Sequence, residues 1–158
     1  MALISPMVRT ALFVSNIDAS AKFYQSIFEL DEVYFEGELT SEAAAQLLGM
    51  PADSITRYKI LRSQGLNKGM IGLFQISNPK PPAVSKDAAT CNVGETCLVF
   101  YCADLDVITE RLNAGGHAMV CPPTHLQVNE TRGQREMTFR DPDGVMINLI
   151  EGDPFRTD

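Results

Sequence analysis

Residues 7–24, MVRTALFVSNIDASAKFY, join a β-strand to an amphipathic helix and decide the fold. Residues 7–15 form a run typical of a strand, and Asn16 or Asp18 is suited to cap the helix that follows. From residue 17 to residue 30 the apolar side chains recur at helical spacing, which predicts a helix.

The same plan returns 88 residues later, where residues 101–106 align with residues 13–18. The end of the strand, the capping residue and the start of the helix coincide at this offset, with the second helix over 105–113. Further strands are expected at 33–35, 56–61 and 69–76 in the first half, and at 119–121, 134–140 and 145–151 in the second. Residues 141–144, DPDG, join the last two as a hairpin, and Pro122 ends the strand at 119–121.

This pattern predicts an α+β fold of two βαβββ modules, at about 7–77 and 95–151, within a single domain over 1–158. Residues 78–94, which contain several prolines, are the expected linker between the modules. A short helix within 40–49 is expected either to lid a site or to cover an edge strand.

The composition excludes several classes of protein. Of 158 residues, 45% are hydrophobic and 21% are charged, which predicts a globular chain. The net charge of −7 argues against binding of nucleic acid or of an anionic membrane. No apolar run is long enough to cross a bilayer and no signal peptide opens the chain, so we expect a cytoplasmic protein. The four cysteines form no CxxC pair and are expected to be reduced thiols.

Two motifs, VSNIDASAKFY at 14–24 and FRDPDG at 139–144, together with the duplicated layout, resemble the vicinal oxygen chelate superfamily. That superfamily includes glyoxalase I, bleomycin-resistance proteins and extradiol dioxygenases. The resemblance covers residues 7–151 and implies two βαβββ modules that form a curved mixed-sheet half-barrel around a small-molecule site. It also implies a homodimer.

The resemblance assigns the four metal-ligand positions of the superfamily to Arg9, Gly72, Cys97 and Asn148. Arginine stays protonated and repels a dication, and glycine offers no side chain. An amide oxygen and one thiol do not make a divalent site. We therefore expect no metal and no other cofactor.

If these positions face the site, strand alternation puts their second neighbours on the same face. The predicted ligand-binding residues are Arg9, Phe13, Met70, Phe74, Cys97, Tyr101, Met146 and Asn148. An apolar and aromatic cavity with few polar groups is typical of a small-molecule site. Arg9 favours a ligand that carries a carboxylate or a phenolate.

Two functions stay open from the sequence. One is a binding protein for a small anionic or aromatic metabolite in a metal-free bowl. The other is a metal-independent isomerase, lyase or hydrolase, with Arg9 as the electrostatic stabiliser and Tyr101 or a histidine as the proton-transfer group. Each residue also has a structural interpretation: Arg9 in an ion pair, Tyr101 as a core aromatic, and His117 and His125 as exposed side chains.

Overall fold

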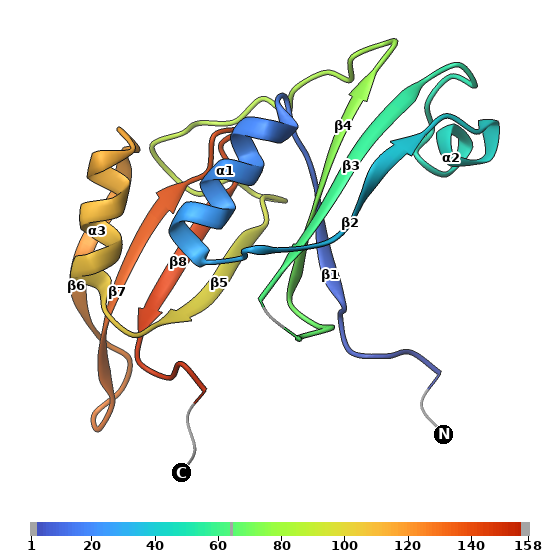
Figure 1. Ribbon diagram of the computed structural model, residues 1–158. Coiled ribbons are helices and arrows are strands. Elements are labelled where there is room, and N and C mark those ends of the chain that lie inside the picture. The colour runs from blue at the N-terminus through green and yellow to red at the C-terminus, as the bar shows by residue number, and fades with distance from the viewer. Residues whose placement is uncertain (1–2, 64, 156–158) are drawn as a thin grey trace. The chain divides into compact units, whose positions relative to one another are not determined.

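The computed structural model describes residues 3–63 and 65–155, and these divide into two compact units, Met1–Val84 and Ser85–Asp158. Each unit contains one four-stranded mixed sheet and a longer helix (Figure 1). The boundary between the units falls inside residues 78–94, the stretch interpreted as a linker.

The first unit has the strand order β1-β4-β3-β2, in which β1 runs parallel to β4 and the other pairs are antiparallel. Its elements are β1 (Arg9–Phe13), α1 (Ile17–Phe28), β2 (Glu32–Leu39), α2 (Glu42–Leu47), β3 (Ile55–Arg62) and β4 (Met70–Ser77).

The second unit has the order β5-β8-β7-β6 with the same directions, so its connectivity repeats that of the first. Its elements are β5 (Cys97–Cys102), α3 (Leu105–Ala114), β6 (Met119–Gln127), β7 (Gly133–Arg140) and β8 (Met146–Glu151). The repeated strand order confirms the predicted α+β fold of two βαβββ modules.

Both long helices begin in the same way. The side-chain oxygen of Asn16 accepts the N–H groups two and three residues ahead, both at 3.1 Å, and Asp104 does so at 2.9 and 3.2 Å. The first N–H of α1 donates to Gln75 Oε1 on β4 at 3.0 Å, and that of α3 donates to Glu151 Oε1 on β8 at 3.2 Å. Each helix is thus capped and also tied to the strand that runs parallel to the first strand of its sheet.

One face of each sheet carries the core. In the first unit α1 packs on β3 and β4, and Leu12, Leu61 and Leu73 are buried. In the second unit α3 packs on β6 and β7, and the buried strand residues alternate with less buried ones. They are Leu98, Met137, Phe139, Ile147 and Leu149. Burial of these apolar side chains stabilises each unit and leaves the other face of the sheet for different contacts.

The expectation that a strand ends before Pro122 is wrong, because β6 continues through both prolines to Gln127. β6 is the last strand in its sheet and pairs only with β7. Its register shifts between Cys121 and Thr124, so the prolines lie at an irregularity where no ladder hydrogen bond is lost. The expected strand at 33–35 is also longer, because β2 extends to Leu39.

Candidate functional site

The first sheet places Arg9 and Phe13 on the face opposite its buried leucines. They lie directly across from Met70 and Phe74 of β4, so the four residues predicted from this module share one face. Tyr58 of β3 pairs with Phe74 and joins them. The ring centroid of Phe74 lies 6.2 Å from that of Phe13 and 6.3 Å from that of Tyr58. Met70 is buried, whereas Phe13 is 55% exposed.

Arg9 and Phe74 together cover Gly72. A Cβ atom added at Gly72 would lie 2.9 Å from Phe74 Cε2 and 3.6 Å from Arg9 Cδ. The arginine stem therefore runs over the strand backbone, beside the aromatic rings, and its residue is exposed. Within residues 3–63 and 65–155, the Arg9 guanidinium has neither an ion-pair partner nor a hydrogen-bond partner, so its interpretation as an internal ion pair is not supported.

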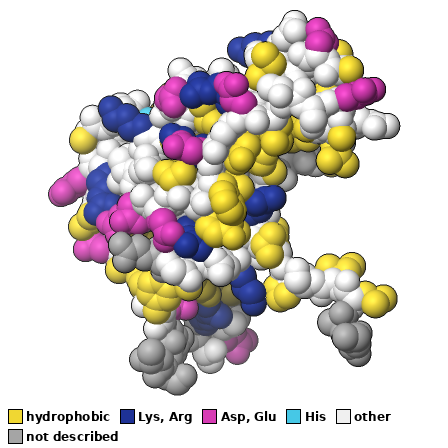
Figure 2. Space-filling view, turned by 45° about the vertical axis from the view of Figure 1, so that its right-hand side comes forward, with side chains coloured by type: hydrophobic (Ala, Val, Ile, Leu, Met, Phe, Trp, Pro, Cys, Tyr) yellow, Lys and Arg dark blue, Asp and Glu magenta, His cyan; other side chains and the backbone are white. Residues whose placement is uncertain are grey.

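Exposed apolar side chains are common on this protein. Figure 2 shows one face of the molecule, on which hydrophobic side chains gather in patches with lysine and arginine between them. Phe13, Val99 and Tyr101 are each more than half exposed, at 55%, 59% and 54%. These three come from the first strand of each module, on the face away from the core.

The second sheet groups the residues predicted from the second module. Cys97 lies across from Met146. Tyr101 lies further along β5 on the same face, because the two positions differ by an even number of residues. Asn148, on β8, shares their face because its partner Val99 lies between Cys97 and Tyr101. All four predicted residues of this module are therefore on one face.

Cys97 is not an activated nucleophile. Partial burial raises the pKa of its thiol, and the Sγ atom lies 3.8 Å from the carbonyl oxygen of Leu98. A nucleophilic cysteine needs a lowered pKa, so at neutral pH this side chain stays a protonated thiol.

Asn148 is held by β7. Its Nδ2 donates to Glu136 Oε2 at 3.0 Å, and it lies 3.4 Å from Thr138 Oγ1. Gln134 Nε2 donates to the other oxygen of Glu136 at 2.6 Å. Strand pairing puts these β7 side chains on the same face as Asn148. Gln134 and Glu136 were not among the residues predicted from the sequence, although polar residues alternate with buried Met137 and Phe139 in this strand.

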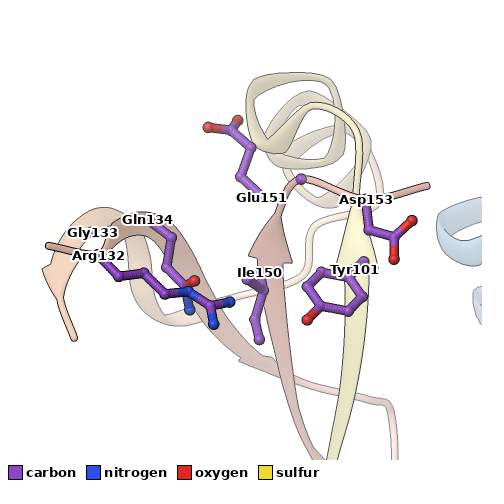
Figure 3. Close-up of a pocket in the computed structure, with 8 residues that line it drawn as sticks. Tyr101, Arg132, Gly133, Gln134, Ile150, Glu151 and Asp153 are labelled. Atoms are coloured by element: carbon purple, nitrogen blue, oxygen red, sulfur yellow. The ribbon is translucent and has the colours of Figure 1, made fainter. Parts of the chain in front are cut away.

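A pocket of about 210 Å³ lies at one end of this face (Figure 3). Figure 3 shows the Tyr101 ring beside Ile150, with the Arg132 and Gln134 side chains on the far side of Ile150. The remaining lining residues are Gly133, Glu151, Gly152 and Asp153. The Glu151 carboxylate turns away and accepts a hydrogen bond from Arg135 Nη1 at 3.0 Å.

The side chains at the four metal-ligand positions do not fit a divalent ion. Arg9 is a cation, and its stem and the Phe74 ring occupy the space that a side chain at Gly72 would need. Cys97 stays protonated, and Asn148 points its amide nitrogen at a carboxylate. Metal ligands must instead present deprotonated sulfur, neutral imidazole or oxygen. Across residues 3–63 and 65–155, no group of three or more His, Cys, Asp or Glu is arranged to hold a metal ion.

The histidines stand apart from these residues within the second unit. His125 lies on β6 opposite Arg135, on the face away from Glu136, and its Nε2 is 3.4 Å from Gln127 Oε1. His117 precedes β6 in the turn after α3. In the part of the chain that the structure describes, no helix is long and apolar enough to cross a membrane.

Comparison with protein families matches residues 7–149 to the Glyoxalase/Bleomycin resistance protein/Dioxygenase superfamily. The chain belongs to this superfamily, which confirms the resemblance drawn from residues 14–24 and 139–144. A comparison with curated proteins finds no match.

Solved structures with the same fold cover nearly the whole chain. A glyoxalase family protein from Bacillus cereus has a TM-score of 0.67 at 18% identity, over 96% of this chain and 95% of that one. TnmS3, an antibiotic binding protein from Streptomyces sp. CB03234, has a TM-score of 0.57 at 19% identity, over 97% and 100%. A mutant of the fosfomycin resistance protein FosX from Listeria monocytogenes, in complex with Mn(II) and 1S,2S-dihydroxypropylphosphonic acid, has a TM-score of 0.56 at 18% identity, over 96% and 94%.

Proposed function

We propose that this chain binds a small anionic or aromatic metabolite and does so without a metal ion. The observation that carries the proposal is the Arg9 guanidinium, which has no partner among the described residues and lies beside the aromatic side chains of the first sheet. Guanidinium groups bind carboxylates and phenolates through paired, charge-assisted hydrogen bonds.

The neighbouring rings supply the apolar part of the site. Phe13, Phe74 and Tyr58 form a row across three strands, and the Phe74 and Tyr58 rings are inclined by only 26°. A planar ligand can pack on such a row, because aromatic pairs gain stability beyond the area that they bury. Arg9 at the edge of the row would then fix the acidic end of the ligand.

The names of the structural relatives agree with a role in small-molecule binding. TnmS3 is an antibiotic binding protein, and the FosX complex contains a phosphonic acid, which is an anion. The FosX complex contains Mn(II), whereas the metal-ligand positions that the superfamily resemblance assigns in this chain are Arg9, Gly72, Cys97 and Asn148. A cationic side chain in place of a metal ligand can supply the positive charge that attracts an anion, even when no metal ion is bound.

A metal-independent isomerase, lyase or hydrolase is the second candidate. What favours it is the exposed Tyr101 ring at the pocket of the second sheet, since a tyrosine hydroxyl can donate or accept a proton. Binding takes precedence because no described residue makes a hydrogen bond to the Tyr101 hydroxyl that would activate it.

The test is a titration of the isotope-labelled protein with benzoate, in which binding is followed by NMR. We expect chemical-shift changes on β1 and β4, and Arg9→Met to weaken benzoate binding about tenfold, the loss expected for one charge-assisted hydrogen bond. Arg9→Lys should recover part of the affinity, because a point charge cannot reproduce the planar fork.

Arg57→Met is the matched control. Arg57 lies on β3 of the same unit, on the helix-covered face, where its Nη1 is 3.6 Å from Asp18 Oδ2. This variant removes the same charge and should leave benzoate affinity unchanged. Wild-type affinity in Arg9→Met, with an unchanged circular dichroism spectrum, would show that Arg9 is not an anchor.

A further inference from the structure

Glu136 carries a half-buried carboxylate whose described partners are all neutral. Gln134 Nε2 donates to its Oε1 at 2.6 Å, and Asn148 Nδ2 donates to its Oε2 at 3.0 Å. No arginine, lysine or histidine forms an ion pair with it within residues 3–63 and 65–155. The other carboxylate on the strands of this unit, Glu151, differs because it pairs with Arg135.

The hydrogen bonds made to this carboxylate leave further acceptor positions on it. A carboxylate accepts about four hydrogen bonds, and two are made here. The amide nitrogen of Gln134 is used by Glu136, so its carbonyl oxygen remains as an acceptor. The Asn148 nitrogen is likewise shared between Glu136 and Thr138 Oγ1, the latter at 3.4 Å. A ligand that meets this group must therefore bring donors.

The Glu136 carboxylate lies outside the lining of the pocket in Figure 3, but its hydrogen-bond partner Gln134 and its strand partner Ile150 belong to that lining. Glu136 lies directly across from Ile150, which lies across from Tyr101, so the three form one row over β7, β8 and β5. Gln134, Ile150 and Tyr101 all line the pocket of about 210 Å³. The half-exposed Tyr101 ring offers its face to a bound group, and an aromatic face attracts a cation.

The charged side chains in and beside the pocket differ in their partners. Arg132 is the positive group in its lining, and it is an exposed residue at the start of β7. Asp153 and Glu136 are negative, whereas the charge of Glu151 is balanced by Arg135. The negative charge of Glu136 is the one that lacks a cationic partner and also lies on the sheet face.

We propose that the sheet face beside this pocket, along the row from Glu136 to Tyr101, binds the primary ammonium group of a small molecule, with Glu136 as its acceptor and Tyr101 packed against its carbon next to the nitrogen. The proposal rests on small-molecule binding as the function of the chain, and it concerns a site whose residues all lie in the second unit. Gln134 and Asn148 are positioning residues, because they orient the carboxylate and need not touch the ligand.

The probes are benzylamine and benzyl alcohol, which have nearly the same shape and differ in charge at neutral pH. NMR titration of the wild-type protein should give the larger affinity for benzylamine, with shift changes at Tyr101 and Ile150. Glu136→Gln should weaken benzylamine about tenfold, the loss expected for one charge-assisted hydrogen bond, and leave benzyl alcohol unchanged.

Glu110→Gln is the matched control, because Glu110 is an exposed residue of α3 in the same unit and its loss changes the net charge equally. Equal weakening by Glu136→Gln and Glu110→Gln would overturn the proposal, since it would indicate only the overall charge. Equal affinity of the wild-type protein for the two probes would also overturn it.

Two further measurements keep the outcome clear. If Glu136→Gln does not fold, Tyr101→Leu replaces it, because Tyr101 is 54% exposed and its change should spare the fold. We expect weaker benzylamine binding in that variant, and unchanged binding would contradict the site. Benzoate binding through Arg9 is measured in parallel. If the wild-type protein prefers benzylamine but does not bind benzoate, the proposed function of Arg9 is wrong. If it binds benzoate but shows no preference for benzylamine, the proposed role of Glu136 is wrong.

Discussion

Gly72 shows how one missing side chain shapes the first sheet. The Phe74 ring and the Arg9 stem lie where its side chain would be, with Phe74 Cε2 only 2.9 Å from an added Cβ. Phe74 lies two residues from Gly72 on the same strand and on the same face of the sheet. Its ring can therefore move away only by a change of rotamer. The placement of Arg9 beside the aromatic row thus depends on glycine.

We therefore predict that Gly72→Ala lowers the free energy of unfolding by about 1–2 kcal/mol, the usual cost of overpacking. Urea denaturation measures it. Phe74→Leu in the same chain should reduce the penalty, because the shorter side chain vacates the space. Additive effects in the double variant would show that Phe74 does not cause the cost.

A second prediction concerns metal content. With Arg9, Gly72, Cys97 and Asn148 at the four ligand positions, we expect the purified protein to hold no stoichiometric Zn, Ni, Mn or Fe. Elemental analysis after dialysis gives the answer, and chelators should leave the melting temperature unchanged. One transition metal per chain would mean that other residues form a site.

The candidate site was predictable in part. Strand alternation identified the faces that carry Arg9 and Asn148, because a period of two needs no knowledge of the neighbouring strands. It did not identify Glu136, because the register between β7 and β8 determines that this residue lies on the same face as Asn148 and across from Ile150. The hairpin at residues 141–144 fixes that register, so pairing residues outward from the turn places Thr138 opposite Asn148 and would have found Glu136.

At the scale of elements, the helix caps were predictable and carry measurable stability. Asn16 satisfies two N–H groups of α1 at 3.1 Å. Asn16→Ala should cost about 1 kcal/mol in the free energy of unfolding, as for other N-caps. Asn113→Ala is the control, because Asn113 lies within α3, where alanine has the higher helix propensity. An equal loss in both variants would argue against a capping effect at Asn16.

Arg140 ties the segment before β5 to the second sheet. Arg140, at the end of β7, donates to Glu95 and to the carbonyl oxygens of Ala88 at 3.0 Å and Thr90 at 2.7 Å. Lys86 Nζ also lies 3.6 Å from Glu95 Oε1. Hydrogen bonds from Arg140, which has the largest effect, and from Asn92 lower the pKa of the Glu95 carboxyl from 4.5 to about 2.

This lowered pKa predicts a pH dependence with a definite sign. A carboxyl with a depressed pKa in the folded state stabilises the fold fully above its unfolded pKa, near 4.5, and loses that contribution as the pH falls through about 2. The difference in melting temperature between wild type and Glu95→Gln should thus be larger at neutral pH and shrink toward pH 2. A constant difference for Glu95→Gln would refute the assignment.

Elements that lie at sheet edges were the least predictable. The sequence pattern placed a strand at 33–35 but not its extension through exposed residues to Leu39, because an edge strand such as β2 buries few side chains. Pro122 was interpreted as the end of a strand, which holds in a central strand but not in β6 at the edge. Periodicity reports burial, so strands with little burial give weak signals.

At the scale of the whole chain, the two units repeat one topology, and each sheet ends in strands with a single neighbour. These end strands are β1 and β2 in the first sheet, and β5 and β6 in the second. Unpaired backbone groups at such edges and exposed apolar side chains such as Phe13, Phe35 and Val99 are features that association can cover. A net charge of −7 would oppose indiscriminate aggregation and leave specific pairing as the remaining route.

We therefore predict a homodimer, since closed two-fold pairing is the commonest way for a single chain to cover such surface. Light scattering at micromolar concentration should give twice the 17.4 kDa mass of one chain. An interface of the size typical of obligate dimers persists at that concentration, so dilution should not change the mass. A species of 17.4 kDa throughout would mean that the exposed strands β1 and β5 stay solvated and that the apolar side chains beside them are free to contact a ligand within one chain.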